Sequence, residues 1–254
     1  MRVQFLTTLL VSRLLIATTV FAGPEIPNEA NQLLDASIAY HDPEGLWVQQ
    51  TWRLVFKEAR PDGSSRETVV VIDNLLGRFE YRTQRGEDRI EGTLSNAAPE
   101  QCSLLLNGTS EFSNEQSEKY RLTCDHLVWL RDYYSYLWGL PMKLRDPGTN
   151  IDPEVIETTY AGQPVLGLKV TYDETVGSDT WYFYLQPDTY ALVGYRFYHD
   201  ETKNDGEYIT LEGEQEIGDL RIPKTRSWYT HGEDKYLGTD TLKAITQISE
   251  PSDK

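Results

Sequence analysis

The sequence predicts a mainly antiparallel β protein: a strongly curved, partly closed sheet (an open barrel) with an N-terminal helix and a central helix packed against it. Most of the chain after residue 46 consists of short runs rich in β-branched and aromatic residues. The connectors between these runs are of hairpin length, which indicates antiparallel pairing rather than parallel βαβ units. Two segments with helical periodicity are too few to cover a large flat sheet on both faces, so a curved sheet closed over its helices fits better.

The two helices are predicted from the spacing of apolar residues. Residues 29–40 carry apolar or small side chains at helical spacing, and Pro43 with Gly45 ends the segment. Residues 125–138 repeat the pattern before Gly139 and Pro141. The strands are predicted at 47–56, 67–73, 78–83, 88–94 and 101–106, and then at 155–160, 165–172, 180–185, 190–199, 207–217, 220–229 and 242–248. A polar loop is expected over 107–118.

Residues 1–22 have the order of features of a secretory signal peptide: Arg2, an apolar stretch over 9–21, and small residues before Gly23. Arg13 interrupts the apolar stretch. The alternative, a membrane anchor, is disfavoured because so short a stretch does not span roughly 30 Å of hydrocarbon. We therefore expect export to the periplasm, a single β-rich domain over 23–254, and no membrane-spanning segment in the mature chain.

The mature chain is strongly acidic. Loss of residues 1–22 removes Arg2 and Arg13, which leaves 22 Lys and Arg against 40 Asp and Glu, a net charge of −18. Charge of this sign repels phosphate backbones and anionic lipid headgroups at long range. Nucleic acid is therefore excluded as an expected partner.

Cys102 and Cys124 are the two cysteines, 22 positions apart. In an oxidising compartment a lone pair is more often bridged than free, so a disulfide is predicted. The alternative, a metal site, needs further nitrogen or sulfur ligands at a defined spacing, and none is present in the sequence.

Several segments of the second half resemble an uncharacterised family of secreted bacterial proteins, a numbered domain of unknown function. The segments are YDETVG at 172–177, DTWYFY at 179–184, YRFYH at 195–199, DGEY at 205–208, LEGE at 211–214, RIPK at 221–224 and YLGTD at 236–240, together with LPMKL at 140–144 and Asp146–Gly148. The resemblance supplies no catalytic residues. More distantly, the order of elements is similar to the periplasmic lipoprotein-carrier (LolA/LolB-like) fold, which implies an open barrel lidded by helices over an apolar cavity.

Sequence motifs for catalysis are absent. The chain has no G-x-S-x-G elbow and no Gly-rich phosphate loop, and its four histidines stand singly, without metal-ligand spacing. No catalytic residue, metal or cofactor is predicted.

Aromatic strands are the main candidate for ligand binding. On 180–185, Trp181 and Phe183 share one face and Tyr184 lies on the other. On the next strand, Leu192 is expected opposite the face that carries Val193, Tyr195 and Phe197. Such residues form an ordinary core or, alternatively, line a ligand cavity. Trp181, Phe183, Tyr184, Tyr195 and Arg196 are the candidates here.

A predicted hairpin at Gly218-Asp219 adds three further candidates: Lys224, Arg226 and Trp228. If Ile217 pairs with Leu220, alternation puts these three on one face with several apolar residues. The two cations could then hold an anionic headgroup, or extend to the rim of the sheet and pair with acids.

Together these patterns favour a non-enzymatic periplasmic protein that binds a hydrophobic or amphiphilic ligand, such as a lipid or acyl chain, in a lidded β cavity. Two alternatives stay open: an envelope protein-interaction module without a cavity, and an extracytoplasmic hydrolase.

Overall fold

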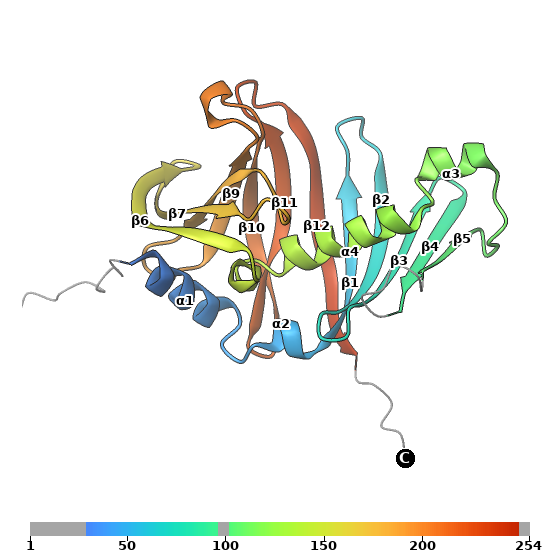
Figure 1. Ribbon diagram of the computed structural model, residues 1–254, viewed down its shortest axis with the longest axis horizontal. Helices are drawn as coiled ribbons and strands as arrows, with labels where there is room; N and C mark the ends of the chain where they lie inside the picture. The colour runs from blue at the N-terminus through green and yellow to red at the C-terminus, as the bar shows by residue number, and fades with distance from the viewer. Residues whose placement is uncertain (1–28, 96–101, 249–254) are drawn as a thin grey trace, which may run out of the picture.

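The computed structural model describes residues 29–95 and 102–248 (Figure 1). The predicted signal peptide, residues 1–22, and the predicted start of the mature chain at Gly23 lie outside the described residues.

Strands dominate the fold and are joined to a small number of helices. The helices are α1 (Ala30–His41), α2 (Leu46–Gln49), α3 (Asn114–Tyr120) and α4 (Cys124–Trp138), with the 3-10 turns η2 (Met142–Arg145) and η3 (Glu201–Lys203). The strands are β1 (Thr51–Ala59), β2 (Ser65–Asp73), β3 (Arg78–Arg85), β4 (Asp88–Leu94), β5 (Cys102–Leu106), β6 (Thr149–Tyr160), β7 (Gln163–Tyr172), β8 (Thr180–Leu185), β9 (Leu192–Tyr198), β10 (Glu207–Ile217), β11 (Leu220–Thr230) and β12 (Tyr236–Ile248).

All twelve strands form one sheet in the order β5-β4-β3-β2-β1-β12-β11-β10-β9-β8-β7-β6, and every neighbouring pair is antiparallel. The chain forms a meander from β1 to β5, crosses through α3 and α4, and returns as a second meander that ends beside β1. β5 and β6 are the two ends, so the sheet is not closed. The predicted class, an open antiparallel β structure with two packed helices, is confirmed.

The central helix α4 lies across the curved sheet between its two halves (Figure 1). Leu127, Leu130, Tyr134 and Leu137 on its inner side are buried in the main core. Behind them, Phe56 of β1 packs against Tyr134 with 5.3 Å between ring centroids. Burial of these leucine and aromatic side chains stabilises the position of the helix on the sheet.

A buried carboxylate also fixes α4. Glu58 of β1 accepts hydrogen bonds from Tyr134 Oη at 2.8 Å and from Thr68 Oγ1 at 2.7 Å, and it forms an ion pair with Arg66. Burial alone would raise the pKa of Glu58, but Arg66 and the hydrogen bonds outweigh it and lower the pKa. The carboxylate therefore stays charged and ties the helix to β1 and β2.

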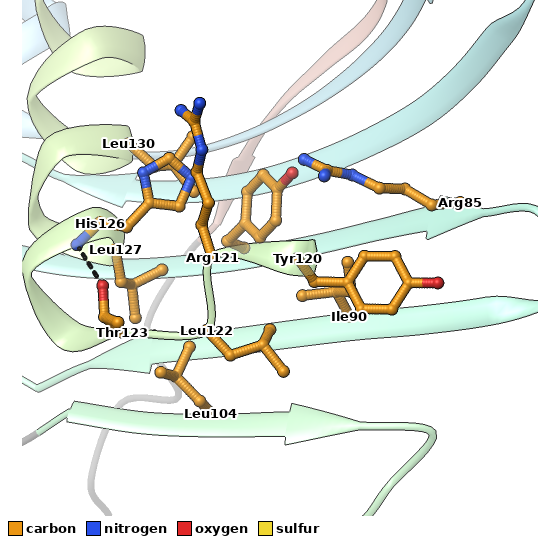
Figure 2. Close-up of a pocket in the computed structure, with 11 residues that line it drawn as sticks. Arg85, Ile90, Leu104, Tyr120, Arg121, Leu122, Thr123, His126, Leu127 and Leu130 are labelled. Atoms are coloured by element: carbon orange, nitrogen blue, oxygen red, sulfur yellow. Dashed lines mark hydrogen bonds between the residues drawn. The ribbon is translucent and has the colours of Figure 1, made fainter. Parts of the chain in front are cut away.

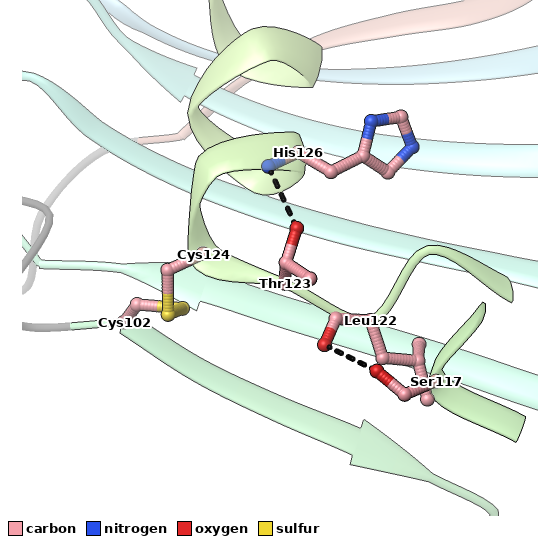
Figure 3. The surroundings of a disulfide bond; sticks show 6 residues. All are labelled: Cys102, Ser117, Leu122, Thr123, Cys124 and His126. Carbon is pink, nitrogen blue, oxygen red and sulfur yellow. Dashed lines mark hydrogen bonds between the residues drawn. A yellow bond between two sulfur atoms is a disulfide. The ribbon is translucent and has the colours of Figure 1, made fainter. Parts of the chain in front are cut away.

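The predicted disulfide between Cys102 and Cys124 is present, with Cα atoms 5.8 Å apart (Figure 3). Cys102 begins the edge strand β5 and Cys124 begins α4. The bridge therefore attaches the N-terminal end of α4 to one end of the sheet.

Two short helices lie where the sequence predicted the start of a strand and a polar loop. Residues 47–49, expected to start the first strand, lie in α2 because the Asp42 carboxylate accepts hydrogen bonds from the Leu46 and Trp47 amides at 2.7 and 2.9 Å. α3 lies in the expected polar loop over 107–118. A capping box between Ser113 and Gln116 stabilises its first turn.

The predicted alternation on β9 is wrong for Leu192 and Val193, which have exchanged faces. Leu192 lies in the same core as Tyr195 and Phe197, while Val193 packs in a separate cluster with Tyr160 and Tyr184. The cause is a shift of register against β8, where Tyr184 pairs with Gly194 but Leu185 pairs with Leu192. An extra residue of this kind reverses the facing of every position before it.

Candidate functional site

A cavity of about 750 Å³ opens between α4 and the part of the sheet formed by β7, β8, β9 and β11. Its lining is rich in aromatic side chains from both the helix and the strands. The lining residues are Trp129, Asp132, Tyr133, Ser135, Tyr136, Leu137, Lys143, Asp146, Tyr172, Thr175, Val176, Gly177, Asp179, Trp181, Phe197 and Trp228. A volume in this range matches small-molecule sites.

The strand side of the cavity is an aromatic surface. Trp181 lies 4.7 Å from Phe197 between ring centroids, and behind it Phe183 stacks nearly parallel at 5.9 Å. Trp228 of β11 stacks with Tyr133 of α4 at 6.3 Å. Neighbouring rings therefore pack against one another along this wall.

The helix side adds neutral hydroxyl groups. Tyr136 of α4 is hydrogen-bonded through its hydroxyl to that of Tyr172 of β7. Burial raises the pKa of Tyr172 to about 12 and the pKa of Tyr136 as well. Both hydroxyls are therefore protonated at neutral pH, so this wall offers hydrogen bonds without charge.

The mouth of the cavity combines apolar and charged groups. Trp129 and Val176 are 54% and 56% exposed, and both line the cavity. Lys143 forms an ion pair with Asp146, and His199 Nδ1 lies 2.7 Å from Asp179 Oδ1. The charges at the mouth are thus largely paired with one another, whereas the apolar groups are open to a ligand.

The predicted site residues do not lie in one site. Trp181 and Trp228 line the cavity, and Phe183 and Tyr195 are fully buried behind them. Tyr184 and Arg196 lie together on the other face of the sheet, where Arg196 stands over the Tyr184 ring at 5.6 Å. Phe183 and Tyr184 were expected on opposite faces of the sheet. This is confirmed, because Phe183 lies in the main core and Tyr184 lies in a separate hydrophobic cluster.

Lys224 and Arg226 lie in the predicted register but not in one environment. Ile217 pairs with Leu220, and Leu211 pairs with Arg226. Arg226 is 1% exposed, whereas Lys224 is exposed, lying beside Gly213, which has no side chain to cover it. Neither residue lines the cavity.

The buried Arg226 donates hydrogen bonds to two backbone carbonyls. Its Nη1 donates to Pro223 O at 3.0 Å and its Nη2 donates to Leu137 O at 2.8 Å, near the C-terminal end of α4. The guanidinium also lies 3.7 Å from the centre of the Trp138 ring. Arg226 therefore supports the end of the helix that forms one wall of the cavity.

Trp129, Tyr133, Tyr136 and Tyr172 belong to the cavity but were not among the predicted site residues. The first three follow one another at spacings of four and three residues on α4, beside the core stripe of Leu127, Leu130, Tyr134 and Leu137. A helix with a second aromatic stripe is a signal that it contacts something besides its core. That stripe could have been found in the sequence.

The contact between His199 and Asp179 does not extend to a catalytic triad among the described residues. The His199–Asp179 pair has no hydroxyl or thiol hydrogen-bonded to the imidazole within residues 29–95 and 102–248, so a nucleophile is missing there. Over the same ranges, no group of three or more His, Cys, Asp or Glu side chains could hold a metal ion. No helix of the described residues is long and apolar enough to cross a membrane.

Comparisons with known proteins give a family match and a solved structure of similar fold. The model of a family of unknown function, DUF6503, matches residues 12–244. A domain from Vibrio parahaemolyticus, described as outer membrane lipoprotein-sorting, has 10% identity and a TM-score of 0.52, and the match covers 88% of this chain and 95% of that one. A LolA superfamily protein from Nitrosomonas europaea, also 10% identical, has the same coverage and a TM-score of 0.48. A search of the curated proteins found no match.

Proposed function

The chain belongs to the DUF6503 family, whose function is unknown, and we propose that it is a non-enzymatic periplasmic protein that binds a hydrophobic or amphiphilic ligand beneath α4. The observation that carries the proposal is the aromatic cavity of about 750 Å³. Sites of this size with apolar walls and a few polar groups are typical of small-molecule binding. A lipid or an acyl chain has the matching chemistry, because the walls are aromatic and the hydroxyls uncharged.

Two further observations support this proposal. The fold is shared with a domain described as lipoprotein-sorting, although a shared fold by itself does not transfer a function. The Cys102–Cys124 disulfide is typical of an oxidising compartment, which fits a periplasmic location.

Binding of the neutral fluorophore N-phenyl-1-naphthylamine tests the proposal. Thr175 is exposed on the β7–β8 loop and lines the cavity mouth. In Thr175→Phe the new ring would take up part of the mouth, so we expect roughly tenfold weaker binding, the equivalent of losing about 50 Å² of apolar contact. Affinity is measured by fluorescence titration.

Glu174→Phe is the matched control, because Glu174 is exposed on the same loop but does not line the cavity. It should bind the fluorophore as the parent does. Native mass spectrometry after gentle purification should also detect a bound lipid in the parent. Equal affinity of both variants and the parent, without any co-purified lipid, would contradict the proposal.

A protein-interaction module is the second candidate, and a separate observation favours it. Val48, Leu75, Leu76 and Ile248 are exposed apolar side chains. They lie near the same ends of the central strands β1, β2 and β12, because Thr51 pairs with both Asp73 and Ile248. Partner binding that is lost when Leu75 and Leu76 are changed to Ser, with ligand binding intact, would support this candidate.

A further inference from the structure

Two arginines and a histidine gather around a small pocket at the N-terminal end of α4 (Figure 2). Arg85 is the last residue of β3, Arg121 follows α3, and His126 lies in the first turn of α4. Ile90, Leu104, Leu122, Leu127 and Leu130 form the apolar part of the lining. The pocket holds about 10 Å³, which is room for one water-sized atom group.

The charge around this pocket is opposite to that of the whole chain. The protein has a net charge of −16, yet the lining residues of this pocket include no Asp or Glu. Neither Arg85 nor Arg121 is part of an ion pair among the described residues. Burial, Arg121 and Arg85 together lower the pKa of His126, which places the three groups within electrostatic reach of one another.

Two buried polar atoms at the pocket have no hydrogen-bond partner among the described residues. One is the hydroxyl of Tyr81, a residue that is 4% exposed, and the other is Arg85 Nε. Buried polar groups are nearly always hydrogen-bonded, so two unsatisfied donors on residues that line the same pocket favour an acceptor bound there. Tyr81 and Arg85 both line this pocket.

The helix itself favours an anion at this position. α4 is 15 residues long, and Thr123 at its N-cap also lines the pocket. The N-terminal end of a helix carries a partial positive charge. Asp125 in the first turn is exposed and does not line the pocket.

We propose that this pocket binds a phosphate-type oxyanion. One oxygen enters the pocket and accepts a hydrogen bond from the Tyr81 hydroxyl. The remaining oxygens lie at the opening between Arg85 and Arg121, with His126 beside them. The pocket volume admits a single buried oxygen, which excludes deep entry of a larger group.

The phosphate could be a free ion or the headgroup of a lipid, and a row of rings connects the pocket with the cavity. His126 stacks on Trp129 at 5.5 Å, and Trp129 stacks on Tyr133 at 5.2 Å. Trp129 and Tyr133 line the cavity. The oxyanion site does not depend on the proposed function, because its residues lie outside that cavity, but a lipid could occupy both.

Binding of inorganic phosphate at constant ionic strength tests the site directly. We expect Arg85→Ala and Arg121→Gly each to weaken phosphate binding roughly tenfold or more, as the loss of one charge-assisted contact does. Glycine suits position 121, where the backbone has φ 55°. Arg89→Ala is the matched control, because Arg89 is an exposed arginine of neighbouring β4 that pairs with Glu91.

Tyr81→Phe separates a binding role from a structural one. It removes a hydroxyl that has no partner, so it should weaken phosphate binding without lowering the thermal midpoint of the phosphate-free protein. In NMR spectra of the parent, phosphate should shift the His126 ring signals and leave those of His41 and His199 unchanged. If phosphate acts no differently from chloride, or if Arg85→Ala, Arg121→Gly and Tyr81→Phe all bind it like the parent, the pocket holds only water and the proposal is wrong.

Dihexanoyl phosphatidylglycerol, used below its micelle concentration, identifies the source of the phosphate. A lipid source predicts tighter binding than inorganic phosphate, weakened by Arg85→Ala and also by Thr175→Phe. A free-ion source predicts that Thr175→Phe does not change binding of the lipid. It also predicts that the lipid binds no more tightly than inorganic phosphate. The neutral fluorophore should be insensitive to Arg85→Ala, so failure of the oxyanion site and failure of the cavity are separate outcomes.

Discussion

Arg226 and Lys224 show how two like residues on one strand face acquire different roles. Arg226 lies under α4, where carbonyl oxygens and the Trp138 ring surround its guanidinium. Lys224, two residues earlier, lies opposite a glycine and faces solvent. A cation next to a helix C-terminus is stabilised by its carbonyls, which explains how a full charge is tolerated inside the core.

Replacement of these two cations should therefore have unequal effects on stability. We expect Arg226→Ala to lower the free energy of unfolding by about 3 kcal/mol, because it leaves a cavity and an unpaired Leu137 carbonyl. Lys224→Ala is the matched control and should change it by less than about 0.5 kcal/mol. Urea denaturation followed by tryptophan fluorescence measures both. A loss of similar size in the two variants would contradict the support role of Arg226.

The sequence could predict which face a residue of β11 occupies, but not whether it is buried. Turn chemistry at Gly218-Asp219 sets the register, and the register held along the strand. Burial depends on what packs over the strand: Arg226 is covered by α4, a contact 89 residues away in sequence. On β9 the predicted faces of Leu192 and Val193 were also wrong, because the sequence does not indicate where an unpaired extra residue shifts the register.

At the scale of elements, α4 is held at both ends. The disulfide fastens its first residue to β5, and Arg226 binds the Leu137 carbonyl near its last turn. Its apolar spacing and its stop at Gly139 made this helix predictable. α2 and α3 are shorter than the length at which periodicity becomes visible. The Asp42 carboxylate stabilises α2, and the capping box of Ser113 and Gln116 stabilises α3.

Loss of the Cys102–Cys124 bridge should weaken the attachment of α4 to β5. Closing a segment of 22 residues in the unfolded chain corresponds to about 3 kcal/mol in the chain-entropy account. The double variant Cys102→Ser/Cys124→Ser should therefore lose about 3 kcal/mol of unfolding free energy in urea.

Reductant provides the control for this experiment. It should lower the stability of the parent to that of the double variant and leave the double variant unchanged. A parent that is equally stable with and without reductant, although thiol titration shows complete reduction, would contradict the prediction.

At the scale of the whole molecule, the cavity depends on contacts between distant parts of the chain. Residues of α4 form one wall, and β7, β8, β9 and β11 form the other. Runs rich in β-branched and aromatic residues predicted the strands, and hairpin-length connectors predicted their antiparallel pairing. The position of α4 across the sheet determines the volume of the cavity and which residues of the helix line it. No local sequence pattern encodes that position.

His41 joins three parts of the molecule and should make global stability depend on pH. The side chain is fully buried at the end of α1, and its Nδ1–H donates to Arg221 O of β11 at 2.8 Å. Nε2 accepts a hydrogen bond from the Leu192 amide of β9 at 2.9 Å. Nε2 can accept this bond only in the neutral imidazole. Burial lowers the pKa of His41 from 6.5 to about 4, and Arg226 and Arg221 act in the same direction.

Because the unfolded chain binds this proton more readily, stability from His41 is complete above pH 6.5 and is lost as pH falls toward 4. Between pH 7.5 and pH 5 we expect the free energy of unfolding to fall by about 2 kcal/mol from this group. Urea denaturation at both pH values measures it. In His41→Gln the fall should shrink by that amount, whereas His199→Gln, which changes an exposed imidazole, should keep it. An unchanged fall in His41→Gln would show that His41 is not the group responsible.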